Sequence, residues 1–110
     1  MQIAARHLDK ITIFDISGDV DLATSPELRK ALLRELREAR MPRVILNLKA
    51  VRYIDSSGVA SLVEGLKVSR DVGARLILYG LNTTVREVLQ LSKLVKIFEI
   101  CESEEQAVTP

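Results

Sequence analysis

The sequence predicts a single α/β domain in which a mixed β-sheet of about five strands is covered by about four helices. At 110 residues the chain is long enough for one hydrophobic core but short for two. Along its second half, short apolar runs typical of strands alternate with segments of helical period. The chain opens with two apolar runs separated only by Asp9-Lys10, as in a tight hairpin. We therefore expect an antiparallel hairpin followed by right-handed parallel crossovers, in one domain spanning residues 1–110.

The first 42 residues are expected to form the hairpin and one helix. The hairpin strands are Ile3–Leu8 and Ile11–Ser17, and a loop begins at Gly18-Asp19-Val20-Asp21. Thr24 and Glu27 have the spacing of a capping box, while Ser25 followed by Pro26 offers an alternative helix start. Apolar residues of helical period continue to Ala39, and Pro42 closes the helix.

The remaining elements are expected in the order strand, helix, strand, helix, strand, helix. The first of these strands is nearly continuously apolar, as in a strand buried on both faces, and a loop should follow it through Tyr53. The expected positions are strand Val44–Leu48, a helix from near Ser57 to Gly73, strand Arg75–Tyr79, a helix capped by Asn82 or Thr83, strand Lys96–Cys101 and a short helix capped at Ser103.

Composition excludes several classes of function. The net charge is only +1, from 16 basic and 15 acidic residues, whereas phosphate binding favours a clear basic excess. With two Tyr, two Phe and no Trp, the chain also has few aromatic side chains for stacking on bases, so a nucleic-acid partner is not expected. The single Cys101 and the single His7 can form neither an internal disulfide nor a Cys/His zinc site. Neither a signal peptide nor an apolar run long enough for a membrane span is present, so we expect a cytoplasmic protein without a membrane partner.

No pattern predicts catalysis, a cofactor or a bound metal. A nucleophilic triad needs an imidazole, and His7 is expected in a strand far from the serines and carboxylates at the strand ends. Neither of the glycine-rich phosphate-binding motifs, G-x-x-x-x-G-K-[ST] and G-x-G-x-x-G, occurs in the sequence. Asp19, Asp21 and Asp55 offer ligands for magnesium, with Asp55 as phosphoacceptor of a receiver-like domain, but residues 75–80 lack the lysine that such a domain would need.

The segment Asp55-Ser56-Ser57-Gly58 is the strongest candidate site. Hydroxyls at a helix N-terminus face unpaired backbone N–H groups and the positive end of the helix dipole, which stabilise an added phosphate. A simpler interpretation is that Ser56 or Ser57 caps the helix and that Gly58 eases a tight turn. From these four residues alone, both interpretations remain open.

The sequence resembles the STAS domains, and among them the bacterial anti-sigma-factor antagonists. The likeness extends over nearly the whole chain, and aspartate, serine, serine or threonine, glycine is its most specific motif. The segments that carry it are Gly18–Asp21, Ser25–Leu28, Val44–Leu48, Tyr53–Gly58, Val85–Ile100 and Glu104–Ala107.

The resemblance implies a protein that binds a partner and is switched by phosphorylation. An unphosphorylated antagonist binds an anti-sigma factor that is also a serine kinase, and so frees a sigma factor; a serine phosphatase removes the phosphate. The matching phosphorylated residue is Ser57, with Ser56 as the second choice. The implied partner-binding residues are Asp21, Thr24, Asp55, Ser56, Ser57, Gly58 and Ser61.

The chain departs from this family at one point. Many antagonists follow the motif with leucine and glycine, whereas this chain has Val59-Ala60-Ser61. A STAS module of another pathway, such as a scaffold, a transporter attachment or a lipid-trafficking component, therefore stays an alternative. In that case it would bind its partner without phosphorylation.

Overall fold

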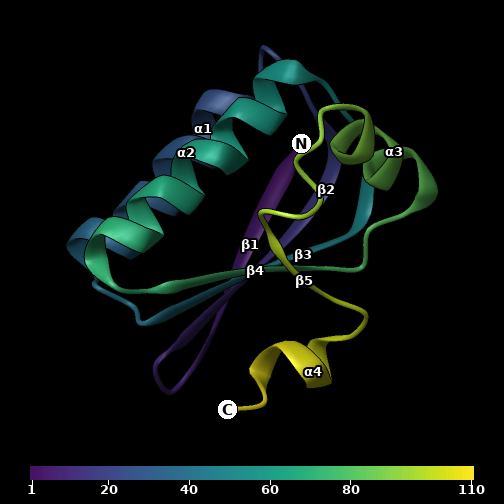
Figure 1. The fold of residues 1–110 in the computed structure, drawn as a ribbon. Helices are drawn as coiled ribbons and strands as arrows, with labels where there is room; N and C mark the ends of the chain where they lie inside the picture. Colours follow the sequence, from purple (N-terminus) through teal and green to yellow (C-terminus); the bar gives the residue numbers. More distant parts are fainter.

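The computed structural model describes all 110 residues and contains one five-stranded sheet (Figure 1). The strands are β1 (Gln2–Leu8), β2 (Ile11–Val20), β3 (Arg43–Ile54), β4 (Arg75–Tyr79) and β5 (Glu99–Cys101). The helices are α1 (Ser25–Leu33), α2 (Ser56–Val72), α3 (Thr83–Leu91) and α4 (Glu104–Val108). β1 pairs antiparallel with β2, and all later neighbours are parallel. The predicted mixed sheet with an N-terminal hairpin is confirmed.

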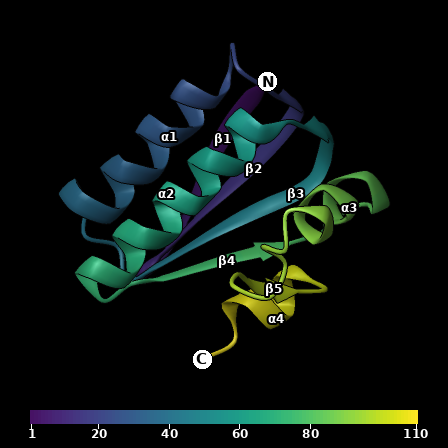
Figure 2. The same ribbon diagram turned by 45° about the horizontal axis from the view of Figure 1, so that its top comes forward.

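The order of the strands in space equals their order in the chain, β1-β2-β3-β4-β5. Successive right-handed crossovers in one direction put their helices on the same face of the sheet. Accordingly, α1, α2 and α3 contribute to one core cluster, whereas α4 packs on the opposite face (Figure 2). Parallel strands also end at a common edge, and the loops at that edge precede α1, α2 and α3.

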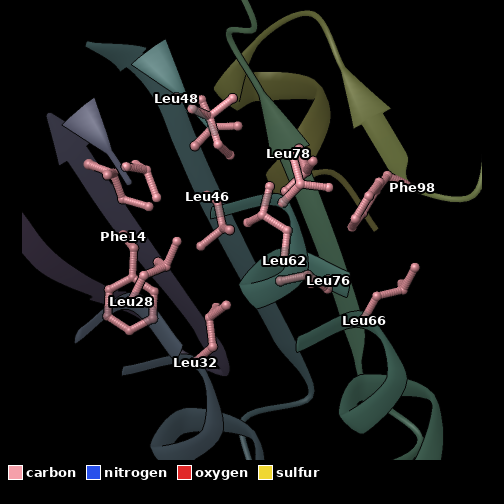
Figure 3. Packing of buried hydrophobic residues seen from close by; sticks show 14 of the residues in the cluster. Phe14, Leu28, Leu32, Leu46, Leu48, Leu62, Leu66, Leu76, Leu78 and Phe98 are labelled. Atoms are coloured by element: carbon pink, nitrogen blue, oxygen red, sulfur yellow. The ribbon is translucent and has the colours of Figure 1, made fainter. Parts of the chain in front are cut away.

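The main core lies between the sheet and the three helices. Its cluster of 20 buried residues includes Phe14, Leu46 and Leu78 of the strands. Figure 3 shows them facing Leu28 and Leu32 of α1 and Leu62 and Leu66 of α2. The opposite face has a smaller cluster of Ile13, Ile45, Ile77, Tyr79 and Ala107, the last from α4.

Both central strands are longer than the sequence predicted. β2 continues to Val20 through two irregularities in its register with β3, and β3 continues to Ile54 through the predicted loop. Val51 and Ile54 are buried, but the residues between them are exposed, so the apolar alternation of a strand is lost although the pairing persists. The last strand is shorter than expected, because residues 96–98 precede β5.

The first helix does not remain α-helical to Ala39. Residues Arg34–Glu38 form a π-helical turn, in which the Ala39 N–H donates to the Arg34 carbonyl at 2.9 Å. The Glu35 carboxylate accepts a bond from the buried Thr12 hydroxyl at 2.9 Å and lies 3.1 Å from His7 Nε2. These contacts draw Glu35 toward the sheet. His7 lies in β1, paired with Thr12 near the start of β2 and away from the carboxyl edge.

The predicted helix caps are confirmed at two of the four helices, α3 and α4. Asn82 accepts a bond from the Val85 N–H at 2.9 Å, and Ser103 accepts one from the Gln106 N–H at 3.2 Å. The capping box of Thr24 and Glu27 was wrong: Thr24 precedes α1, but its side chain makes no capping bond.

An ionic network fixes α4 to the sheet. The Arg6 guanidinium contacts the Asp15 carboxylate at 2.6 Å and the Glu104 carboxylate at 2.5 Å. The Tyr79 hydroxyl donates to Glu104 at 2.7 Å. Arg6 holds the pKa of Asp15 and of Glu104 below their usual values. Burial, and next the bond to Glu104, raises the pKa of Tyr79 to about 12.

Replacing Arg6 should remove a stabilisation that depends on pH. Because the folded-state pKa of both carboxyls is lowered, the stabilisation is present above their unfolded pKa and is lost as pH falls through the folded one. We expect Arg6→Met to lower the free energy of unfolding by about 1 kcal/mol at pH 7, an amount appropriate to a partly exposed network.

Thermal or urea unfolding at pH 7, 4 and 2.5 would measure this dependence. The difference between wild type and Arg6→Met should shrink toward pH 2.5. Arg34→Met is the control, because Arg34 and Glu38 are 3.9 Å apart and largely exposed. A difference for Arg6→Met that stays constant with pH would contradict the ionic origin of the effect.

Candidate functional site

The predicted site residues gather at the carboxyl edge of the sheet. β2 ends at Val20 and β3 at Ile54, and these two residues are partners in the sheet register. The Asp55 N–H donates to the Val20 carbonyl at 3.1 Å, so the two strand ends stay joined where their loops begin. The loop before α1 and the start of α2 therefore lie side by side, as expected from the topology.

Asp55 is the cap of α2. Its Oδ1 accepts bonds from the backbone N–H groups of Ser57 at 2.9 Å and Gly58 at 3.0 Å. Its Oδ2 accepts a bond from the Leu22 N–H at 3.1 Å. One carboxylate thus fixes both the helix start and the preceding loop. The simpler interpretation, in which Ser56 or Ser57 caps the helix, was wrong.

The two serines occupy the first turn of α2. Ser56 is exposed and Ser57 is half-buried, as the first and second helical residues. Because Asp55 supplies the cap, neither hydroxyl is required for it. A 17-residue helix also offers the positive end of its dipole at this turn.

Gly58 is needed for close packing of α2 against the sheet. A Cβ at this position would lie 2.6 Å from the Ile54 side chain and 2.8 Å from the Val20 carbonyl oxygen. Gly58 is buried, so the structure gives this predicted partner-binding residue an internal role.

Ser61 is also internal. Its side chain is buried, and its hydroxyl lies 3.2 Å from the carbonyl oxygen of Ser25 and 3.3 Å from that of Ser57. Ser61 therefore links the first turns of α1 and α2, and it offers little surface to a partner.

Asp21 and Thr24 shape the loop before α1. Asp21 Oδ1 accepts bonds from the N–H groups of Ala23 at 3.0 Å and Thr24 at 3.1 Å. The Thr24 hydroxyl accepts a bond from the Asp21 N–H at 2.9 Å and lies 3.0 Å from the Asp19 carbonyl oxygen. Both residues lie beside the site, as predicted, and they order the loop that carries Leu22.

The carboxylates of the site do not form a metal centre. No three His, Cys, Asp or Glu side chains anywhere in the structure are arranged to hold a metal ion. Asp19 pairs with Arg52 at 3.5 Å, and Asp55 accepts three backbone N–H bonds. His7 is not brought to this edge of the sheet.

No helix combines the length and apolar character needed to cross a membrane.

Sequence reasoning missed two features beside the serines. Leu22 is 75% exposed, although its backbone is fixed by Asp55. A groove also extends from Ser56 along α2 to Leu94. The large apolar side chain of Leu22, in the short loop between Asp21 and Thr24, was the available signal for the first feature. The groove lies between α2 and the segment that contains Leu94, which are distant in the sequence, so no local sequence signal could predict it.

Comparison with known families identifies the fold. The model of the STAS domain matches residues 2–107. The chain belongs to the STAS domain family. This STAS domain is 28% identical over 109 residues to the anti-sigma F factor antagonist of Paenibacillus polymyxa, covering 99% of this chain and 93% of the relative. It is 31% identical over 101 residues to the anti-sigma-B factor antagonist of Listeria monocytogenes, covering 91% of this chain and 86% of that relative.

Solved structures of the anti-sigma factor antagonist SpoIIAA share the fold. Its unphosphorylated form matches with a TM-score of 0.76 at 18% identity, covering 96% of this chain and 92% of that one. Its phosphorylated form, from Bacillus, also matches with a TM-score of 0.76 at 21% identity, covering 97% of this chain and 96% of that one.

Gly58→Ala should destabilise the STAS domain although alanine is the better helix former. The propensity gain is about 1 kcal/mol, whereas overpacking against a backbone carbonyl typically costs about 1–3 kcal/mol. Urea unfolding should show a net loss. Gly65→Ala is the matched control, because its Cβ would meet only the Leu32 side chain below 3.0 Å. A Gly58→Ala variant as stable as wild type would contradict the close packing.

Proposed function

We propose that this STAS domain is an anti-sigma-factor antagonist controlled by phosphorylation of Ser57. Unphosphorylated, it binds an anti-sigma factor with serine-kinase activity and releases a sigma factor. The kinase phosphorylates Ser57 and ends the binding, and a serine phosphatase restores it. The protein acts in the cytoplasm and catalyses no reaction of its own.

One observation carries the proposal: a serine pair occupies the first turn of α2 while Asp55 provides the cap. The hydroxyls are therefore available for modification without loss of the helix start. The names of the Paenibacillus and Listeria relatives support an antagonist function. The description of one SpoIIAA structure as phosphorylated supports modification within this fold.

The helix start suits a phosphate on Ser57. The kinase would supply ATP and the base that accepts the hydroxyl proton, and Ser57 Oγ would form the new bond to phosphorus as ADP leaves. In the product, the phosphate lies at the positive end of α2, which stabilises it. The fold should therefore tolerate the modification.

The same phosphate opposes a docked partner. It adds nearly two negative charges beside Asp21 and Asp55, and these must be desolvated when a close-packed interface forms. A penalty of about 3 kcal/mol lowers affinity more than a hundredfold. The switch requires no change in the shape of the domain.

Ser57 is proposed over Ser56 because it matches the phosphorylated serine in the family motif. Exposure alone favours Ser56, since Ser56 is exposed and Ser57 half-buried. The two serines are adjacent helical residues and point in different directions, so only one can face a given kinase active site.

The alternative functions use the same edge of the sheet. A STAS module of another pathway would bind a partner there without phosphorylation. This second candidate is supported by Val59-Ala60-Ser61, which replaces the leucine and glycine that follow the motif in many antagonists. A receiver-like phosphoaspartate at Asp55 is disfavoured, because both of its carboxylate oxygens already accept backbone N–H bonds.

Incubation with the anti-sigma factor kinase of the source genome and ATP should add one acid-stable phosphate. Ser57→Ala should abolish it, because it removes the hydroxyl, and Ser56→Ala should leave it. Mass spectrometry after proteolysis locates the group. A phosphate on Ser56, Thr24 or Asp55 would refute the assignment, and a domain that binds this kinase but is never modified would favour the second candidate.

Ser57→Asp should weaken binding to the kinase at least tenfold, while changing the unfolding free energy by about 1 kcal/mol or less. Asparagine has nearly the same shape as aspartate but no charge, so Ser57→Asn should lose less affinity than Ser57→Asp. Thr84→Asp controls for stability, because Thr84 is the second residue of α3 as Ser57 is of α2. Calorimetric titration and thermal melts measure both quantities. Equal affinities for Ser57→Asp and wild type would exclude a charge switch.

A further inference from the structure

β1 forms an outer edge of the sheet and lacks the features that usually prevent an edge strand from pairing. It is last in the strand order, and all its residues except the half-buried Ile3 are exposed. Natural edge strands are commonly short, bulged or covered, or they carry lysine or proline. β1 has seven residues in an uninterrupted register with β2, and its sequence QIAARHL contains neither lysine nor proline. The charge of Arg6 is already paired with Asp15 and Glu104.

The opposite edge of the sheet is protected. β5 has only three residues, Glu99–Cys101, so it offers a short template for pairing. The first of them, Glu99, is a charged residue that pairs with Arg75 of β4. Pairing with a further strand is therefore expected at β1 and not at β5.

The hairpin determines which backbone groups of β1 point outward. A two-residue turn joins Leu8 to its partner Ile11, and the pair that flanks such a turn is hydrogen-bonded. Bonded and non-bonded pairs alternate along an antiparallel ladder. The N–H and C=O groups of Ile3, Ala5 and His7 therefore point away from β2 and are available to another strand.

We propose that a second copy of the chain pairs with β1 in antiparallel orientation, around a two-fold axis at Ala5, so that two sheets become one. In this register Ala5 lies opposite Ala5 of the second copy, and Ile3 lies opposite His7 of the second copy. Every residue from Gln2 to Leu8 then has a partner, and all three outward-facing residues exchange backbone bonds. The inference goes beyond the proposed function and is independent of Ser57.

The side chains favour this register over the neighbouring ones. Arg6 lies opposite Ala4 of the second copy, which leaves room for the guanidinium and its bonds to Asp15 and Glu104. An axis at Arg6 would place two arginines directly opposite each other, and like charges in that position are destabilising. An axis at Ala4 would leave Leu8, which is 47% exposed, without a partner.

α1 adds a second layer to this contact, because one flank of the helix follows β1 (Figure 2). Near its start, Glu27 lines a surface depression together with Ile3. Just beyond its end, Glu35 lies 3.1 Å from His7 Nε2. Glu27 and Arg34 are seven residues apart, a spacing that puts them on the same side of a helix. The flank beside β1 thus carries an acid near the Ile3 end and a base near the His7 end.

This flank is self-complementary in charge. The two-fold axis brings the Ile3 end of one copy beside the His7 end of the other, so Glu27 of each copy faces Arg34 of the other. Both side chains are exposed. Glu27 takes part in none of the ion pairs of the chain, and Arg34 lies 3.9 Å from Glu38. The helix layer also enlarges the strand contact toward the roughly 800 Å² per partner of specific interfaces.

Sedimentation velocity over a hundredfold range of protein concentration tests the association. Wild type should change from monomer to dimer. Ala5→Pro removes an outward-facing N–H, and an edge strand tolerates proline where its N–H faces solvent, so the variant should fold. Its Kd for dimerisation should rise at least tenfold. Thermal melts should confirm that each variant is folded.

Charge reversal tests the helix layer without changing β1. Arg34→Glu should raise the Kd for dimerisation about fivefold, because it replaces two attractions by repulsions. Adding Glu27→Arg to this variant should restore the attraction and the affinity. Arg37→Glu is the matched control and should stay within about twofold of wild type. Arg37 is exposed on the same helical segment, but it lines a separate groove with Arg29.

Oxidative cross-linking tests the register. The Cα atoms of a hydrogen-bonded antiparallel pair are about 5.5 Å apart, and a disulfide spans about 4.4–6.8 Å between Cα atoms. In a Cys101→Ser background, Ala5→Cys should therefore give a disulfide-linked dimer. Ala4→Cys is the control, because Ala4 lies on the other face of the strand and opposite Arg6 of the second copy.

Three outcomes would contradict the proposal. A wild type that stays monomeric at every concentration would overturn it. A dimer that neither Ala5→Pro nor Arg34→Glu weakens would place the second copy on another surface. A cross-link through Ala4→Cys and none through Ala5→Cys would refute the register. Because none of these measurements uses the kinase or Ser57, failure here leaves the proposed function standing, and failure of the proposed function leaves this dimer standing.

Discussion

The contact between the start of α2 and the ends of β2 and β3 determines the geometry of the candidate site. Gly58 allows this contact, because any side chain there would meet the Val20 carbonyl and Ile54. Asp55 completes it by binding two N–H groups of α2 and one of the preceding loop. The carboxylate has only two oxygens, and both are used. The relative position of the loop and the helix is therefore fixed by one side chain.

This arrangement separates the residues that build the site from those available to a partner. Asp21, Thr24 and Asp55 are engaged with backbone groups, and Gly58 and Ser61 are buried. Leu22, Ser56 and Ala60 are exposed around them, and Ser57 is half-buried. Residues of a shared motif can thus be essential for different reasons. Substituting the first group would test the fold, whereas substituting the second would test recognition.

Much of the fold could be predicted because its signals are local. The hairpin at Asp9-Lys10, the caps at Asn82 and Ser103 and the short apolar run of β4 each depend on neighbouring residues. The placement of Asp21 and Asp55 at one edge followed from parallel topology alone.

The remaining features arise from contacts between distant residues. β3 extends to Ile54 because β2 pairs with it through two register irregularities, and exposed Lys49, Arg52 and Tyr53 hide this pairing in the sequence. The π-helical turn accompanies the contact of Glu35 with Thr12, 23 residues away. The sequence left open a cap of α2 by Ser56 or Ser57, because serine and aspartate are both good caps, and only the observed bonds identify Asp55.

The agreement between strand order and chain order has a consequence for how the domain is made. Every strand pairs with its neighbour in the sequence, so each pairing is completed by a single hairpin or a single helical crossover. During synthesis from the N-terminus, β1, β2, α1, β3 and α2 emerge before the rest of the chain. The segments that carry Leu22, Asp55 and Ser57 are thus all available by Val72. The final third of the chain then supplies Leu94, the far wall of the groove, and α4, which covers the opposite face of the sheet.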